Sequence, residues 1–135
     1  MAPTKIDVVA IRSSDDVVRV RQQARILAVA CGLSLVDQTK IVTAASELAR
    51  NTLDYGGGGE ARMELVEAGG RRGLRLAFED RGPGIADVKL ALTDGYTTGS
   101  GLGLGLSGAR RLSNEFSIES KVGEGTKVTI TRWKT

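Results

Sequence analysis

The sequence predicts an α+β fold, a two-layer sandwich in which a mixed, mostly antiparallel β-sheet carries its helices on one face. Hydrophobic periodicity changes along the chain in the order β-α-α-β-β-(short α)-α-β-β. Three of the strand connections are short or hairpin-like, which favours antiparallel neighbours. The 135 residues have the size of one domain, 1–135, and 41% of them are hydrophobic. With one Trp, two Tyr and two Phe, the core must be aliphatic.

One strand and two helices are expected before the first glycine-rich stretch. The segment Lys5–Ile11 alternates and is rich in β-branched residues, as in a strand. Ser13–Asp15 can cap a helix that ends at Gly32, with apolar residues at helical spacing: Val17, Val20, Ala24, Leu27 and Cys31. The pattern S-x-x-D at Ser34–Asp37 is a capping box that opens a second helix. Its apolar stripe is Leu35, Ile41, Val42, Ala45, Leu48 and Thr52, and it ends before Tyr55 and the glycines 56–59.

Two hairpins, a short helix and a third long helix are expected in the remainder. The first hairpin joins strands 60–67 and 73–79 through Gly69 and Gly70, which suit a tight turn. Residues 80–85 form a turn, 87–92 one or two helical turns, and 97–105 a glycine-rich loop. The third helix covers 106–114 or starts earlier, near Leu102. The last strands, 116–122 and 126–133, are joined by a turn at 123–125.

Composition excludes several classes of function. The chain has no histidine, which rules out Ser-His-Asp and Cys-His catalysis, histidine-ligated metals and phosphorelay through histidine. Cys31 is the single cysteine, so no internal disulfide can form, and we expect it in the core. Nineteen basic and sixteen acidic residues are well mixed, which gives little support for nucleic acid as a partner. No apolar run of ~20 residues and no signal sequence is visible, so we expect a cytoplasmic protein without membrane contact.

Glu47 and Asn51 form the first candidate site. They are four residues apart on the second helix and therefore share one helix face. The surrounding residues are mostly apolar, which places the pair near the boundary of the core. A carboxylate and an amide oxygen on one face suit a hard cation and its waters. A solvated polar helix face would show the same spacing.

The segment Asp80-Arg81-Gly82-Pro83-Gly84 forms the second candidate site, directly after a strand. A carboxylate at a strand end can accept a hydrogen bond from an exocyclic amine such as that of adenine. The two glycines allow close backbone approach and unusual dihedral angles. An ordinary turn has a similar composition.

Two further clusters are rich in glycine. In 99–106, Gly99, Gly101, Gly103 and Gly105 alternate with other residues, so that backbone N–H groups before a helix can point at an anion. The run lacks the G-K-[ST] of a Walker loop, and it does not follow a strand as a Rossmann fingerprint would. The alternating leucines argue against a merely flexible loop. The last cluster, 123–126 with Thr126, is by itself only a turn between strands.

Together and in this order, the four clusters resemble the nucleotide-binding signature of the GHKL superfamily, which includes gyrase, Hsp90, histidine kinases and MutL. The resemblance covers roughly 34–133 and implies the GHKL (Bergerat) ATPase fold with ATP and Mg²⁺ as cofactors. It implies Asn51 as Mg²⁺ ligand and Asp80 as acceptor for the adenine amine, with Gly82 and Gly84 in the same motif. It implies Gly99, Gly101, Gly103 and Gly105 at the phosphates and Thr126 on the adenine side.

Within the superfamily, the chain is most similar to the bacterial anti-sigma-factor and serine-kinase branch, in particular to its stressosome switch kinases. The segments that carry this likeness are 43–51, 79–85 and 131–133. It implies a serine/threonine kinase that phosphorylates a STAS-domain scaffold protein and can then activate a PP2C-type phosphatase. Glu47 is placed to orient or deprotonate the acceptor hydroxyl as the catalytic residue. Two alternatives stay open: an anti-sigma factor that binds an RNA polymerase sigma factor, and a nucleotide-binding module without transfer activity.

Overall fold

The computed structural model describes residues 2–93 and 104–135, and its elements follow the predicted order. They are β1 (Ala2–Ile11), α1 (Ser14–Cys31), α2 (Leu35–Asp54), β2 (Gly59–Ala68), β3 (Arg71–Asp80), α3 (Val88–Ala91), α4 (Leu104–Arg111), β4 (Glu115–Lys121) and β5 (Gly125–Trp133). The hydrophobic periodicity of the sequence thus predicted each described strand and helix. The predicted and observed elements differ only in where they begin and end.

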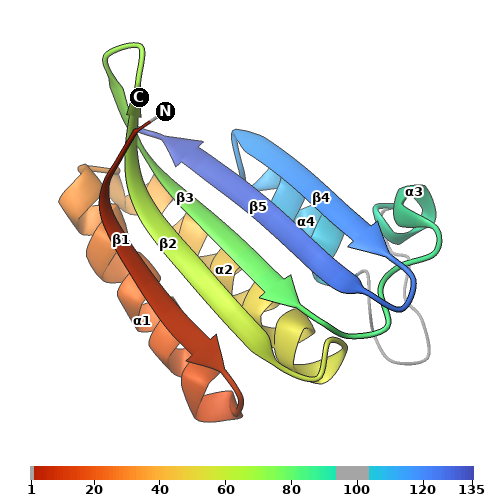
Figure 1. Ribbon diagram of the computed structural model, residues 1–135. Coiled ribbons are helices and arrows are strands. Elements are labelled where there is room, and N and C mark those ends of the chain that lie inside the picture. The colour runs from red at the N-terminus through yellow and green to blue at the C-terminus, as the bar shows by residue number, and fades with distance from the viewer. Residues whose placement is uncertain (1, 94–103) are drawn as a thin grey trace.

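The five strands form one sheet in the order β1-β2-β3-β5-β4. All four pairings are antiparallel. No parallel pair occurs among the described strands, so the sheet is antiparallel throughout rather than mixed. Helices α1, α2 and α4 lie side by side on one face of it, and both termini lie at the same end (Figure 1). The predicted α+β two-layer sandwich is confirmed.

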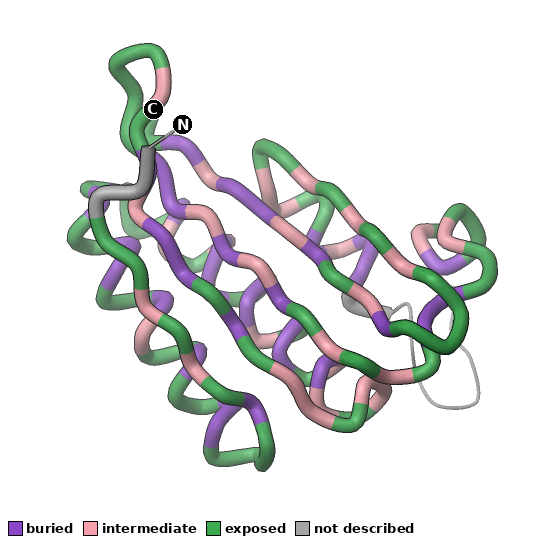
Figure 2. Tube along the Cα trace, in the orientation of Figure 1, coloured by how far each residue is buried: buried purple, intermediate pink, exposed green. Residues whose placement is uncertain are grey.

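The core lies between the sheet and the helix layer, where the buried residues concentrate (Figure 2). The strands contribute Ile11, Met63, Leu76 and Ile130 to it, all fully buried. Helix α1 contributes the predicted stripe, including Cys31, which is 2% exposed. Phe78 is the one Phe among the fully buried side chains, so the core is aliphatic as expected.

The two long helices begin differently from what their sequences suggest. At α1, the Ser13 side chain makes no capping bond; instead Asp16 accepts a hydrogen bond from the Arg12 backbone N–H at 2.8 Å. At α2, the Ser34 hydroxyl accepts from the Asp37 backbone N–H at 3.1 Å, as predicted. The carboxylate of Asp37, however, pairs with Arg132 of β5 at 2.8 Å. The predicted reciprocal capping box is therefore half formed, because a partner 95 residues away takes the carboxylate.

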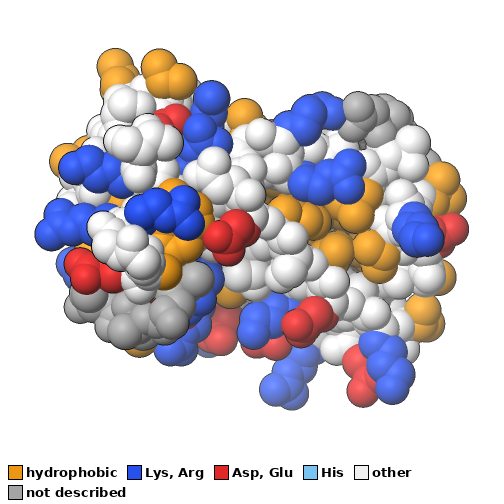
Figure 3. Space-filling view, turned by 90° about the horizontal axis from the view of Figure 1, so that it is seen from above, with side chains coloured by type: hydrophobic (Ala, Val, Ile, Leu, Met, Phe, Trp, Pro, Cys, Tyr) orange, Lys and Arg blue, Asp and Glu red, His pale blue; other side chains and the backbone are white. Residues whose placement is uncertain are grey.

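Helix α4 also differs from its predicted extent. It ends at Arg111, three residues before Asn114, where the Ser113 hydroxyl donates back to the Ala109 carbonyl at 2.7 Å. Leu104 and Gly105 belong to this helix rather than to the expected loop. The rest of that expected loop lies outside the described residues. On the face seen from above, basic and acidic side chains are interspersed rather than gathered in one area (Figure 3).

Candidate nucleotide-binding site

The end of β3, the start of β5 and the end of α2 meet at the end of the sheet opposite to the termini (Figure 1). A small cleft there is lined by Leu48, Asn51, Thr52, Tyr55, Phe78, Asp80, Ile85, Leu106, Thr126 and Val128. Three of the predicted site residues, Asn51, Asp80 and Thr126, are thus brought together from three separate elements. The cleft measures about 20 Å³, which is close to the space of one water molecule.

Asp80 is the last residue of β3, directly opposite Thr126 of β5 in the antiparallel register. Its carboxylate accepts a hydrogen bond from the Gly82 backbone N–H at 2.9 Å, and the Thr126 backbone N–H is a second donor. Burial raises the pKa of the Asp80 carboxyl, the two backbone donors act against this shift, and neighbouring Glu79 adds to it. The fold therefore fixes the position of a carboxylate whose charge it only partly stabilises.

Glycines pack tightly around Asp80 because three backbone segments converge there. A Cβ on Gly56 would collide with the Asp80 side chain, and a Cβ on Gly82 would lie 2.7 Å from the Gly56 Cα. Gly84 has a φ of 74°, and a Cβ there would collide with the Lys121 carbonyl. The predicted close approach at Gly82 and Gly84 is thus made to the protein's own backbone. Gly56, which the sequence marked only as a helix breaker, makes room for the carboxylate.

Ser120 was not identified from the sequence, although it connects three parts of this site. Its hydroxyl accepts a hydrogen bond from the Ile85 N–H at 2.7 Å and lies 2.8 Å from the Thr126 hydroxyl. In addition, the Tyr55 hydroxyl donates to the Gly84 carbonyl at 3.1 Å and ties the end of α2 to the turn after β3. Ser120 faces Thr126 across the β4–β5 hairpin, so the strand register could have revealed it once the hairpin was assigned.

Asn51 and Glu47 differ in their surroundings although they are one turn apart on α2. The Asn51 Nδ2 is buried and has no hydrogen-bond partner among the described residues. A buried amide without a partner costs about 1–3 kcal/mol, so the described surroundings leave this side chain incompletely satisfied. Glu47 is exposed and does not line the cleft. Of the two predicted residues, Asn51 therefore lines the cleft, whereas Glu47 is exposed to solvent outside it.

The predicted phosphate-binding glycines are only partly placed. Gly99, Gly101 and Gly103 lie outside the described residues, and Gly105 is the second residue of α4. Leu106, in the same first turn, is 2% exposed and lines the cleft. Helix α4 therefore begins beside the cleft, and the N-terminus of a helix in general favours an anion.

Comparisons with known proteins assign the chain to a family. The family model of histidine kinase-, DNA gyrase B- and HSP90-like ATPases matches residues 36–135. The chain belongs to this family. A GHKL relative, the serine/threonine-protein kinase RsbT of Bacillus subtilis (strain 168), is 45% identical over 125 residues, which are 93% of this chain and 94% of that one. This relative supports the kinase predicted from the sequence.

A solved structure of the RsbU and RsbW domains of Rv1364c from Mycobacterium tuberculosis shares the GHKL fold with a TM-score of 0.67. Its sequence identity is 24%, and the match covers 99% of this chain and 34% of that one. This likeness concerns the fold alone. In the described part of the chain, no helix is long and apolar enough to cross a membrane.

Proposed function

We propose that this chain, as one domain over 1–135, is a serine/threonine protein kinase that transfers the γ-phosphate of ATP to a STAS-domain protein. One observation carries the nucleotide assignment: Asp80, Thr126 and the buried amide of Asn51 line one cleft. An ionised carboxylate held by backbone N–H groups is an acceptor for the adenine amine and rejects a base that offers a carbonyl there. The relative RsbT supports the transfer activity.

The residues of the cleft fit a single Mg²⁺ that the nucleotide brings with it. Among the described residues, no group of three or more carboxylate, thiol or imidazole side chains could hold a metal on its own. Mg²⁺ in nucleotide sites takes few protein ligands, with phosphate oxygens and waters completing the shell. Asn51 would be the protein ligand, since a half-turn of its amide exchanges the buried Nδ2 with Oδ1. When bound, the ion neutralises charge on the phosphates.

Glu47 would act on the acceptor rather than on the nucleotide. It lies one turn before Asn51 on α2, about 6 Å along the helix axis. Its exposed carboxylate is open to a protein substrate that approaches from outside, whereas Asn51 is open to the cleft. In this arrangement Glu47 accepts the proton of a serine or threonine hydroxyl, or orients that hydroxyl toward the γ-phosphate.

We further propose a cytoplasmic partner-switching role, in which the phosphorylated STAS protein releases the kinase and the kinase then activates a PP2C-type phosphatase. The relative RsbT is a serine/threonine-protein kinase, which supports the phosphorylation step of this role. A phosphate adds about two negative charges at the contact surface, and this change weakens the complex. Neither nucleic acid nor membrane is needed for such a role.

The activity is tested by incubating the chain with labelled ATP, Mg²⁺ and a cognate STAS protein. We expect label on a serine or threonine of the STAS protein and no stable label on the chain itself. Glu47→Gln should bind ATP normally and transfer phosphate at least ~10²-fold more slowly, while Asn51→Ala should lose Mg²⁺-dependent ATP binding. Glu67→Gln, in β2 at the opposite end of the sheet from Asp80, is the matched control for loss of one exposed carboxylate.

Two results would contradict the proposal. Full transfer by Glu47→Gln would make Glu47 an ordinary exposed helix residue. Label on neither protein, together with tight binding to a sigma factor, would identify the chain as an anti-sigma factor of the same branch.

A further inference from the structure

Helix α1 carries a second apolar stripe that its own fold does not use. The stripe toward the sheet, which includes Val17, Val20 and Leu27, is buried. On the other side, Val18, Ile26 and Val29 are 37%, 57% and 58% exposed. Their spacing of eight and three residues places them on one helix face. A helix that needs only one apolar face for its own fold has here a second one for contact with another molecule.

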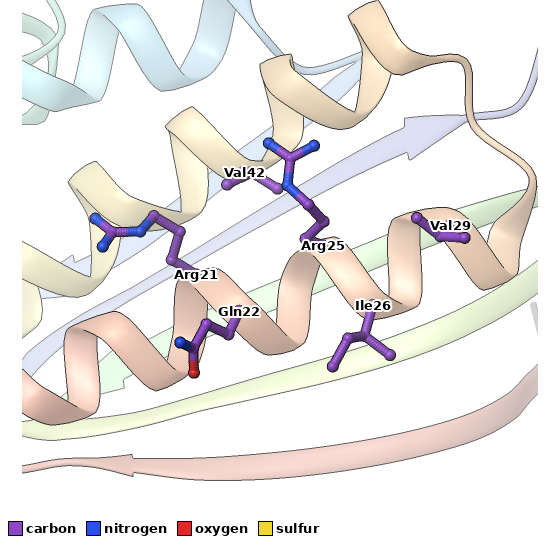
Figure 4. A pocket seen from close by; sticks show the side chains of 6 residues that line it. All are labelled: Arg21, Gln22, Arg25, Ile26, Val29 and Val42. Carbon is purple, nitrogen blue, oxygen red and sulfur yellow. The ribbon is translucent and has the colours of Figure 1, made fainter.

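An open surface depression of about 720 Å³ lies beside this stripe. It is lined by Arg21, Gln22, Arg25, Ile26 and Val29 of α1 and by Val42 of α2. We refer to these six residues as the α1–α2 groove. In Figure 4 the strands run behind the helices, so the groove lies on the side of the helix layer away from the sheet. Arg21 and Arg25 extend toward α2, and Ile26 points the other way.

The charge around the groove is positive and not neutralised locally. Arg25 contacts the Gln38 side chain at 3.5 Å, and neither Arg21 nor Arg25 has an ion pair with a described residue. Between residues 17 and 43 the only carboxylate is Asp37, which is buried against Arg132. A ligand with carboxylates at the edge of an apolar surface therefore complements this groove.

We propose that the α1–α2 groove docks an amphipathic helix of a protein partner, with apolar residues on its inner face and Glu or Asp along its edge. A helix suits the shape, because five of the six lining residues form one face of α1, and one helix packs against another through residues one turn apart. A second copy of this chain does not suit it. A two-fold contact through this face would bury the arginines of both copies against a surface whose lining residues include no carboxylate to pair with them. This proposal rests on the proposed function, because the partner that carries this helix is taken to be the protein substrate of the kinase.

The groove lies close enough to the candidate site to hold such a partner in place for it. Val42, on the α2 side, is five residues before Glu47 and nine before Asn51. At 1.5 Å per residue these intervals are about 8 and 14 Å along one helix. A partner helix in the groove is thus anchored about one and a half turns of α2 from the exposed carboxylate of Glu47, without covering the cleft.

The test uses a synthetic 16-residue helical peptide with leucines at i, i+3, i+4 and i+7 and glutamates along the edge. Chemical-shift mapping with the full chain should show changes centred on residues 18–29 and 39–43.

The charge-reversed variant Arg21→Glu with Arg25→Glu should bind this acidic peptide at least tenfold more weakly. It should bind the same peptide with lysine in place of glutamate more tightly than the wild type does. Higher salt should weaken only the matched-charge pair. Arg12→Glu with Arg72→Glu changes the net charge equally and should leave both affinities unchanged.

Several outcomes would overturn the proposal. These are equal binding of the acidic peptide to the groove variant and to the wild type, shifts centred on the open face of the sheet, and a concentration-dependent dimer that the groove variant abolishes. Binding of acidic lipid vesicles with no binding of the peptide would assign the groove to a membrane surface instead.

A kinase assay separates this proposal from the proposed function. With a cognate STAS protein, the groove variant should raise the KM for the protein at least tenfold and leave the KM for ATP unchanged. If the wild type binds no ATP, the proposed function fails while the peptide result still stands. If phosphorylation is normal in the groove variant, the partner uses another surface and the groove proposal fails.

Discussion

The Asp80 carboxylate is held in a fixed position by hydrogen bonds, although its burial disfavours the negative charge. Its neighbours across β5 and in the following turn supply backbone N–H donors, yet burial still raises the pKa of its carboxyl. A ligand that donates a hydrogen bond to this carboxylate adds the stabilisation that the fold does not complete. The adenine amine is such a donor, which explains why an incompletely satisfied carboxylate suits a nucleotide site.

The first consequence is base selectivity. In Asp80→Asn the amide offers its donors as well as an acceptor to the base, so we expect ATP binding to weaken by at least tenfold. GTP, which has a carbonyl in place of the amine, should be affected less. Competition against a fluorescent adenine nucleotide measures both. Glu67→Gln, which removes an exposed carboxylate at the opposite end of the sheet, is the control and should leave the ATP-to-GTP ratio unchanged. Equal affinity of the wild type for ATP and GTP would end the adenine assignment.

The second consequence is a pH dependence with opposite signs for binding and for stability. In the proposed site the adenine amine donates to the ionised carboxylate, so ATP affinity should fall as the pH drops through the raised pKa of Asp80. Because this pKa is higher in the folded than in the unfolded chain, the stability contribution of Asp80 is complete below its unfolded pKa. It is lost as the pH rises through the folded pKa. The difference between wild type and Asp80→Asn, in calorimetry and in urea unfolding, isolates both effects from other titrating groups. A difference that does not change with pH would contradict this account.

At the scale of the elements, what could be predicted from the sequence is what depends on local pattern. The strands and long helices follow from period and caps, since apolar stripes such as Val17–Val20–Ala24 report which side of an element is buried. Prediction from the sequence was incomplete where the hydrogen-bond partner of a side chain is distant along the chain. Asp37 leaves its local cap for Arg132 of β5, and the role of Ser120 exists only once Ile85 and Thr126 are beside it.

The candidate site shows the same division. Asn51, Asp80 and Thr126 were found because each stands in a recognisable motif, and the fold brings them to one cleft. The sequence predicted that Gly82 permits a close backbone approach, but not that the neighbouring backbone is that of Gly56, from another loop. The exposed position of Glu47 was not foreseen either, since a spacing of four residues gives a shared face and not its exposure.

The turn after β3 allows a test that separates backbone conformation from close packing. Gly57 and Gly84 have nearly the same φ, 76° and 74°. A Cβ on Gly57 meets nothing within 4 Å, whereas one on Gly84 collides with the Lys121 carbonyl. Gly57→Ala should therefore cost only the left-handed conformation, about 1–2 kcal/mol, and Gly84→Ala clearly more. Urea unfolding measures both. Equal losses would mean that the β4–β5 hairpin moves away freely and does not hold the turn in place.

At the scale of the whole molecule, an ion pair among the described residues joins the helix layer to the sheet. The Arg132 side chain in β5 donates to the Asp37 carboxylate at the start of α2 at 2.8 Å and to the Leu112 carbonyl just beyond α4 at 3.3 Å. Both side chains of the pair are 12% exposed. The contact therefore fixes α2, which carries Asn51, and α4, which carries Gly105, to the same strand of the sheet. The cleft lies between the end of α2 and the start of α4, so its width depends on the spacing between these two helices.

Breaking this pair from one side should be costly, because it leaves a largely buried charge without its partner. We expect Asp37→Ala to lower the free energy of unfolding by about 3–5 kcal/mol. Asp37→Leu combined with Arg132→Met should recover much of that loss, since apolar side chains can replace a buried pair. Glu124→Gln, which removes the exposed pair with Lys121, should change stability by less than about 0.5 kcal/mol. Chemical denaturation of the four proteins gives these values directly. A loss for Asp37→Ala no greater than that of the exposed control would show that water reaches Arg132 and that the two layers are held by their apolar core alone.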